Sequence, residues 1–415
     1  MEENQGDFIM TLRLSRTFAL LVSLLLVFLC ACSPQQPAPD PKPEPSEPSS
    51  EDPLPQPQPQ PTPEDDPLPQ PAPDDEITGE NTSVAEGIWK IDTSYFTENR
   101  LVLDSFFVAG NDRVLLFVSP LNDDGTVSES SAVYFFSLST GHFLSEHLDL
   151  GVISMYPDRV YDDGTVSVVT MDSESYQFRD IVFIDPQAIS MSSVPVPSDS
   201  DIISLSVSPD KQHVAVTTLQ GLNITSLDFS SVSLQIPNEQ TSDGDELCPS
   251  PSDWSADSRQ LSFKTAMWES ILFPSIADVQ SGAVTELDML SGSEVYFAGG
   301  DLFYSSWFPY LPCGFCAQDG SGAVQTPLSC VPEPTQLCVF SPSPARTHLA
   351  LAIQTESGCS AMVADARSGE VLSSLSLPDA SFHEAFFTSD ERTAVFSTAS
   401  TLESPKELYV MDFGW

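Results

Sequence analysis

Basic residues are scarce in this sequence. Its 415 residues include 15 Lys and Arg against 60 Asp and Glu, which gives a formal net charge of -45. Proteins that bind nucleic acid need clusters of Lys and Arg to neutralise phosphates, and no such cluster is visible. The same charge predicts repulsion from an anionic lipid surface. We therefore expect no nucleic-acid partner, and we interpret the acidity mainly as a source of solubility through self-repulsion.

Several patterns that enzymes and metal proteins carry are also missing. The chain has no G-x-S-x-G nucleophile elbow and no nucleotide-binding loop. Two acidic runs, 122–125 and 162–164, lack the spaced ligands of a calcium loop and are better explained as turns. The histidines are scattered through the chain and indicate no metal site, so we expect no cofactor and no metal; they are His142, His147, His213, His348 and His383.

The apolar run from Phe18 to Leu29 is too short for a stable membrane span. It follows Arg13 and Arg16, an arrangement typical of a secretion signal. Because the nine residues before Met10 are acidic, which is unusual for the start of a signal, we suspect that translation begins at Met10. This pattern predicts that residues 1–31 are a signal peptide and that the mature protein is exported.

The signal ends in Leu29-Cys30-Ala31-Cys32. This stretch resembles the lipobox of bacterial lipoproteins, in which a Leu and a small residue precede the modified cysteine. The resemblance implies that Cys32 becomes the lipid-carrying N-terminus and that Cys30 is discarded. The alternatives are a buried thiol in an uncleaved anchor helix, or a metal clip, for which no paired Cys or His follows nearby. We expect the protein to be anchored at the outer face of the cytoplasmic membrane, or at the outer membrane of a cell that has two.

Residues 32–81 begin with the lipidated cysteine and continue as a segment rich in Pro, Asp and Glu, without apolar residues to form a core. Proline fixes φ and removes hydrogen-bond donors, and the carboxylates repel one another, so we expect a disordered, extended spacer. At about 3.1 Å per residue its reach is on the order of 150 Å. A ligand for a proline-binding adaptor is the less favoured alternative.

From residue 82 to 415 the sequence repeats seven times, and two features recur. The first is a hairpin whose polar turn separates two alternating apolar runs. These turns are spaced by 43 to 51 residues and lie at Asp112, Asp163, Asp210, Asp257, Gly300, Ala345 and Asp390.

The second feature is a later strand that ends in an acidic residue and is followed by a turn. The acidic residues are Asp185, Asp228, Asp278, Asp319, Asp365 and Asp412. Glycines in these turns would supply the positive φ that tight hairpins need; they are Gly141, Gly282, Gly322 and Gly369.

Four strands in about 45 residues are typical of a β-propeller blade. The turns SPDK (208–211), SADS (255–258) and SDER (389–392) resemble the SPDG turn of WD-repeat-like and TolB-like propellers. The Trp-Asp pair of WD repeats is absent from the predicted third strands, and their Gly-His pair is not recognisable at the starts of the predicted blades. The resemblance implies an all-β fold, a seven-bladed propeller of four-stranded blades.

The seventh repeat has three strands, the last of them at Glu407–Asp412, and lacks a fourth. The segment Gly87–Asp92 precedes the first repeat and is unassigned. We predict that it pairs into the last blade as the outer strand and closes the ring, because closure removes exposed strand edges. A partial eighth blade or an open ring is the alternative.

Six cysteines remain for the exported domain, and an even number favours disulfides, with 15 possible pairings. The disulfide candidates are Cys248, Cys313, Cys316, Cys330, Cys338 and Cys359. Cys313-Gly-Phe-Cys316 has the spacing of a redox motif, but it lies in a predicted third strand rather than in a βα unit. A structural role is therefore favoured over metal binding or redox catalysis.

Loops that join second to third strands, and those that join successive blades, share one face of a propeller. We call it the loop face. Exposed Trp and Tyr beside carboxylates suit stacking on a sugar or anchoring a protein. The binding candidates on this face are Trp268, Trp307, Tyr310, Asp123, Asp124 and Tyr176. Packing of Trp307 against its own blade is the alternative.

These features favour a surface-tethered, noncatalytic propeller that binds an extracellular protein or glycan through its loop face. We expect it to be a monomer held at the membrane by its lipid. One alternative is an exported hydrolase or lyase with carboxylates in the central channel. Another is a structural scaffold of an envelope assembly.

Overall fold

The computed structural model describes residues 81–122, 132–151, 154–172, 175, 177–198, 201–240, 246–266, 272–287, 290–306, 313–326, 336–355, 358–377, 381–399 and 406–414. All of them belong to one compact unit that spans residues 66–415. The predicted signal peptide, Cys32 and most of the predicted spacer lie outside the described residues. Within the described ranges, no helix has both the length and the apolar character that crossing a membrane requires.

Seven antiparallel sheets follow one another along the chain, each with strands in up-and-down order. Blade 1 contains β3 (Leu101–Ala109), β4 (Arg113–Pro120), β5 (Ala132–Ser137) and β6 (His142–Asp149). Blade 2 contains β7 (Ser154–Val160), β8 (Val166–Met171), β9 (Phe178–Asp185) and β10 (Ser190–Pro195). Blade 3 contains β11 (Ile202–Val207), β12 (His213–Thr218), β13 (Gly221–Ser226) and β14 (Val232–Pro237).

Blade 4 contains β16 (Glu246–Trp254), β17 (Gln260–Ala266), β18 (Leu272–Asp278) and β19 (Val284–Glu286), with the short β15 (Glu239–Gln240) paired to β16. Blade 5 contains β20 (Ser293–Ala298), β21 (Asp301–Ser306), β22 (Cys313–Cys316) and β23 (Val324–Thr326). Blade 6 contains β24 (Gln336–Pro342), β25 (His348–Thr355), β26 (Gly358–Asp365) and β27 (Val371–Leu377).

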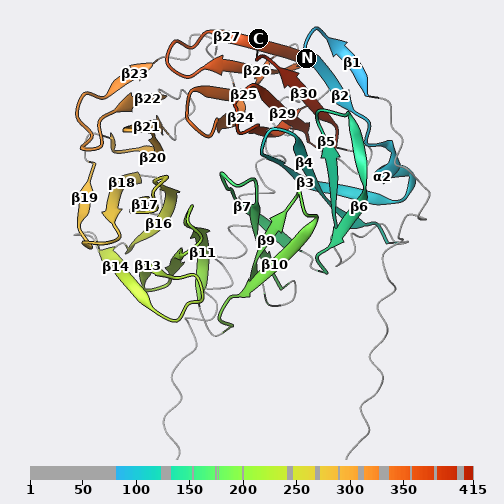
Figure 1. The fold of residues 1–415 in the computed structure, drawn as a ribbon. Helices are drawn as coiled ribbons and strands as arrows, with labels where there is room; N and C mark the ends of the chain where they lie inside the picture. Colours follow the sequence, from blue (N-terminus) through green and yellow to red (C-terminus); the bar gives the residue numbers. More distant parts are fainter. Residues whose placement is uncertain are drawn as a thin grey trace, which may run out of the picture. The chain divides into compact units, whose positions relative to one another are not determined.

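Blade 7 is built from both ends of the described chain. Its strands β28 (Phe382–Phe387), β29 (Thr393–Thr398) and β30 (Leu408–Asp412) are followed in space by β2 (Ile88–Ile91) and β1 (Thr82–Ala85). Ile88 pairs with Met411, and Ile91 pairs with Leu408. The prediction that the segment Gly87–Asp92 completes the last blade is therefore confirmed, and Figure 1 shows β2 beside β30. The additional strand β1 and the short helix α2 (Ser94–Glu98) were not predicted.

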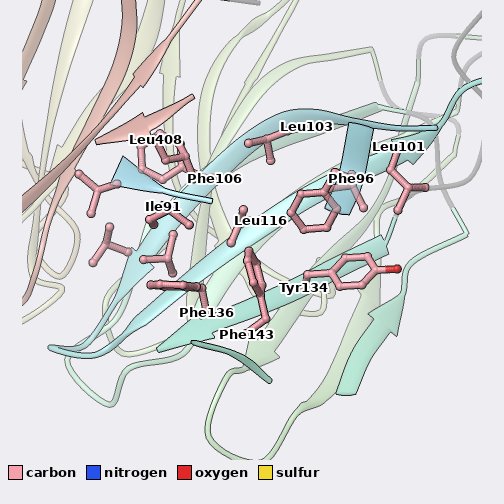
Figure 2. Close-up of a cluster of buried hydrophobic side chains, with 14 of the residues drawn as sticks. Ile91, Phe96, Leu101, Leu103, Phe106, Leu116, Tyr134, Phe136, Phe143 and Leu408 are labelled. Atoms are coloured by element: carbon pink, nitrogen blue, oxygen red, sulfur yellow. The ribbon is translucent and has the colours of Figure 1, made fainter. Parts of the chain in front are cut away.

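The hydrophobic core is divided among the junctions between neighbouring blades. Each of the seven buried clusters combines residues from two adjacent blades, so the blades close a ring. Figure 2 shows the cluster at the closure, where Ile91 and Leu408 of blade 7 pack with Phe106 and Leu116 of blade 1. The all-β seven-bladed propeller that the sequence predicted is the observed fold.

The recurring Asp and Gly residues form the turn between the third and fourth strands. Asp365, for example, accepts hydrogen bonds from the backbone N–H groups of Arg367 and Ser368 at 3.0 and 2.6 Å. Gly369 follows with φ of 73°, a value that favours glycine. The acidic repeat therefore has a structural role as a turn former.

The turns between first and second strands differ from the SPDG pattern at their last residue. Four of them place a residue with a side chain in the left-handed region where glycine is usual. These residues are Lys211 (φ 57°), Ser258 (φ 58°), Arg346 (φ 61°) and Glu391 (φ 57°).

The side chains at these positions reach the preceding blades. The Ser258 hydroxyl accepts the backbone N–H of Asp210 at 2.9 Å. Glu391 accepts hydrogen bonds from the Ala345 N–H and the Thr347 hydroxyl. The strained backbone therefore supports contacts that join one blade to its neighbour.

A candidate binding pocket on the loop face

None of the six predicted binding residues is among the residues that the structure describes, so their role in binding stays a prediction. They are Trp268, Trp307, Tyr310, Asp123, Asp124 and Tyr176. The strand order nevertheless defines the loop face. It contains the segment 267–271, which joins β17 to β18 and carries Trp268.

A pocket of about 310 Å³ lies on this face, between the outer strand of blade 3 and blade 4. Thr265 and Phe273, which flank residues 267–271 in the chain, both line it. The other lining residues are Ile236, Pro237, Glu239, Leu247, Pro249, Phe263, Pro274, Ser275, Val284, Glu286, Leu287 and Ser291. The sequence indicated the face but not the pocket, because its lining comes from seven separate segments.

The outer strand of blade 4 ends beside the pocket. β19 pairs with β18 at Ser275, Ile276 and Ala277. One further contact follows, in which the Leu287 N–H donates to the Pro274 carbonyl at 2.9 Å. Phe273 lies beyond this last contact, and Phe273, Pro274 and Leu287 all line the pocket.

The wall is mainly apolar and has charge at its edge. Phe273 and Val284 are exposed to 39% and 45%, which is high for large apolar side chains. Pro237, Pro249 and Pro274 present no N–H group. The carboxylates of Glu239 and Glu286 are exposed, and none of the described lining residues is Lys or Arg. Such a pocket suits an apolar group that carries positive charge nearby.

The inner strands hold charged side chains that are paired with one another. Asp253 on β16 contacts Arg159 of blade 2 at 3.3 Å and Arg346 of blade 6 at 3.1 Å. It also accepts the backbone N–H of Phe297 at 3.0 Å. A carboxylate held by two guanidinium groups and an amide is poorly placed to act as a base or a nucleophile.

Asp158 on β7 is in a different environment. Its carboxylate accepts hydrogen bonds from the Ser167 hydroxyl at 2.7 Å and from the Val207 N–H of blade 3 at 3.2 Å. Burial nevertheless raises the pKa of Asp158, against the opposing effect of Arg159 and these donors. The group therefore joins blades 2 and 3 rather than facing an open cavity.

A buried lysine joins blades 7 and 1. Lys406 is exposed to only 4% in its side chain and donates to the Asp104 carbonyl and to Glu384, the latter at 3.1 Å. Burial alone would raise the pKa of Glu384, but His383 and Lys406 outweigh it and lower that pKa. This ion pair reinforces the junction that β2 closes.

The acidic turn in blade 2 behaves as an ordinary turn. Asp163 accepts the N–H and hydroxyl of Thr165, at 3.0 and 2.7 Å, and the ammonium of Lys211 at 2.6 Å. Burial would raise the pKa of Asp163, but these donors lower it to about 2. Among the described residues, no three His, Cys, Asp or Glu side chains are grouped so that they could hold a metal ion.

The two cysteines of the CxxC motif point to opposite faces of β22, because they are three residues apart in a strand. Cys313 packs between blades 5 and 6, and Cys316 packs between blades 4 and 5. Burial raises the pKa of Cys316 to about 11. A redox disulfide within this motif would require β22 to lose its extended conformation and its pairing with the neighbouring strands.

Cys338 and Cys359 lie together in the cluster between blades 6 and 7. A hydrogen bond between their thiols lowers the pKa of Cys359 to about 7. Of the predicted disulfide candidates that the structure describes, these are the two that it brings into contact. Cys330 lies outside the described residues, and the formation of disulfides in this domain stays a prediction.

No known family profile matches the sequence, and no curated protein matches it. Solved structures do match. A prolyl endopeptidase superimposes with a TM-score of 0.53 at 14% identity, over 76% of this chain and 48% of that one. An acylaminoacyl peptidase from Pyrococcus horikoshii has a TM-score of 0.53 at 10% identity, over 76% and 51%. The propeller domain of the Trilobed protease from Pyrococcus furiosus has a TM-score of 0.51 at 10% identity, over 75% and 95%.

The chain therefore spans about half the length of the two peptidases. TolB from Acinetobacter baumannii (TM-score 0.40, 13% identity, 78% and 84% covered) is another structural neighbour. The propeller domain of Cps50 (Swd1) from Myceliophteria thermophila is a further one (TM-score 0.47, 10% identity, 75% and 99% covered). At these identities the likeness concerns the fold alone: the protein is a seven-bladed β-propeller, and its activity must be argued from its own surface.

Proposed function

We propose that this protein is a surface-tethered, noncatalytic propeller that binds an extracellular protein or glycan through its loop face. The observation that carries the proposal is the apolar pocket of about 310 Å³ between blades 3 and 4, which opens on that face. Pockets of this size, with an apolar wall and a few polar groups, are the usual form of a recognition site.

The inner strands support a noncatalytic role. Asp253 and Glu384 are held in ion pairs, and Glu294 is held by Lys264 and by the Tyr296 hydroxyl. A hydrolase or lyase needs a carboxylate that can exchange a proton with its substrate. These three side chains instead use their charge to join blades and strands.

The anchoring part of the proposal comes from the sequence. Lipidation at Cys32 and the acidic, proline-rich segment 32–81 would hold the propeller away from the membrane surface, as a monomer with its loop face accessible. Mass spectrometry of the mature N-terminus tests this part. A diacylated or triacylated Cys32 supports it, and an uncleaved chain would refute it.

The binding function is tested with the purified protein, immobilised and exposed to a cell-envelope extract and to a glycan array. The variant Phe273→Asp places a charge in the pocket, and Leu372→Asp places one at an equally exposed apolar site on β27 of blade 6. A defined partner that is retained by the native protein and by Leu372→Asp, and lost with Phe273→Asp, supports the proposal. If Phe273→Asp folds and retains every partner, the pocket is not the recognition site.

A further inference from the structure

The chemistry of the pocket points to its partner. We propose, on the basis of the function proposed above, that the pocket binds a polypeptide segment that inserts one large apolar side chain and carries Lys or Arg on either side of it.

The apolar part of this partner follows from the pocket walls. Leu247, Phe263 and Phe273 form a surface against which a large apolar side chain can be desolvated. Pro249 and Pro274 lie in strands and offer no N–H, and the Pro274 carbonyl already accepts the Leu287 N–H. A polar group placed against this wall would lose its water without gaining a partner.

The positive charge follows from electrostatic complementarity. Glu239 and Glu286 are the charged residues of the lining, both are exposed, and the chain as a whole has a net charge of -45. Cations beside the apolar anchor would approach these carboxylates as the side chain enters. An acidic segment would be repelled at the same positions.

A glycan fits the described walls less well than a peptide does. Sugar recognition requires a dense set of hydrogen-bonding side chains. The hydroxyl groups of the lining are those of Thr265, Ser275 and Ser291, and Ser275 is only 5% exposed. An aliphatic and proline-rich wall instead resembles the apolar centre of a protein interface, where one anchor residue supplies most of the affinity.

The first test measures binding of three fluorescent peptides to the purified full chain by anisotropy. One peptide carries a Trp flanked by Lys, the second carries the same Trp flanked by Glu, and the third carries Gly flanked by Lys. We expect the first to bind at least about tenfold more tightly than either of the others, and its affinity to fall as salt is added.

The second test uses variants of the pocket and matched controls elsewhere. Glu239→Gln/Glu286→Gln should weaken the Lys-flanked Trp peptide by about tenfold and flatten the salt dependence. Phe273→Ala should remove most of the binding. Glu86→Gln/Glu370→Gln changes two exposed carboxylates outside the pocket, and Leu372→Ala removes an apolar side chain of the same exposure, 39%. Both controls should bind as the native protein does, and thermal melts show that each variant is folded.

Three outcomes would overturn the inference. One is binding of the Lys-flanked Gly peptide as tight as that of the Trp peptide, because attraction to a negative surface would then explain it. The second is equal loss of peptide binding in the pocket variants and the controls. The third is retention of an envelope partner that depends on Phe273 but is not displaced by the Lys-flanked Trp peptide. In that last case the proposed binding function stands and only the partner class is wrong.

Discussion

Arg346, in the turn between β24 and β25 of blade 6, reaches across to Asp253 in blade 4 at a distance of 3.1 Å. Arg159 of blade 2 approaches the same carboxylate at 3.3 Å. Three alternate blades are therefore connected through one side chain, in addition to the apolar packing between neighbours. The Arg346 guanidinium also lies 5.2 Å from the centre of the Tyr296 ring in blade 5.

Replacement of Asp253 should be strongly destabilising. Asp253→Asn would leave two guanidinium groups without their anion, and breaking a buried ion pair in this way costs about 3–5 kcal/mol. Equilibrium urea unfolding measures the change. The control is Asp301→Asn, which breaks an exposed pair with Arg367 at 3.6 Å and should cost less than about 1 kcal/mol. Equal effects of the two substitutions would show that the connection across the blades contributes nothing.

Substitution by glycine should affect stability differently at two left-handed turn residues. Relief of the unfavourable φ is worth about 1 kcal/mol. In Ser258→Gly this gain roughly offsets the loss of one neutral hydrogen bond to Asp210, so stability should change little. Glu391→Gly loses charge-assisted hydrogen bonds to Ala345 and Thr347 and should be destabilised by about 2 kcal/mol. Denaturation midpoints of the two variants measure these changes in stability. A Glu391→Gly variant more stable than the native protein would contradict this explanation.

The strand that closes the ring should contribute to global stability. Ile91 on β2 is fully buried in the cluster between blades 7 and 1. Ile91→Ala removes apolar contacts there and should cost about 2–4 kcal/mol. Val84→Ala on the neighbouring β1, where the side chain is 41% exposed, should cost well under half as much. Thermal unfolding of the two variants tests the prediction.

The CxxC motif should be inert in the native protein. Cys313 and Cys316 face different blade junctions, so mild oxidation should not join them. Peptide mapping without reduction, followed by mass spectrometry, tests this. Any crosslink found between described cysteines of the folded protein should join Cys338 and Cys359, whose thiols meet. A Cys313–Cys316 disulfide in protein that still has a native melting curve would refute the prediction.

Alkaline pH should weaken the fold. Burial raises the pKa of Cys316 from 9.0 to about 11 and that of Tyr134 from 10.0 to about 12. The folded state therefore holds protons that the unfolded chain releases, and stability falls as pH rises. The stabilisation is complete below the unfolded pKa of about 9 and is progressively lost up to about 12. Urea midpoints across this range test the sign, and Cys316→Ala should show a smaller decline than the native protein.

The sequence predicted the propeller because a blade has a period, and the period survives when individual residues change. Asp365 and Gly369 recur in equivalent places because the same turn must form in several blades. No repeating pattern in the sequence marks the pocket. Its lining combines Ile236 of blade 3 with Phe273 of blade 4, which is a matter of tertiary packing.

The role of Arg346 could not be predicted from the sequence either. Nothing in the local sequence pattern indicates that Arg346 would reach Asp253, 93 residues earlier in the chain. Long-range ion pairs of this kind follow from the geometry of the closed ring. They become visible only when three-dimensional neighbours are known.

The pairing of Ile88–Ile91 with Leu408–Asp412 also sets the order in which the protein can be completed. During synthesis, β2 can pair with β1, but its other edge has no partner until almost the whole chain has emerged. A chain interrupted in its last repeat would keep an unpaired strand edge at the seventh blade, open to degradation or to association with other chains. Closure of the ring thus distinguishes finished molecules from unfinished ones.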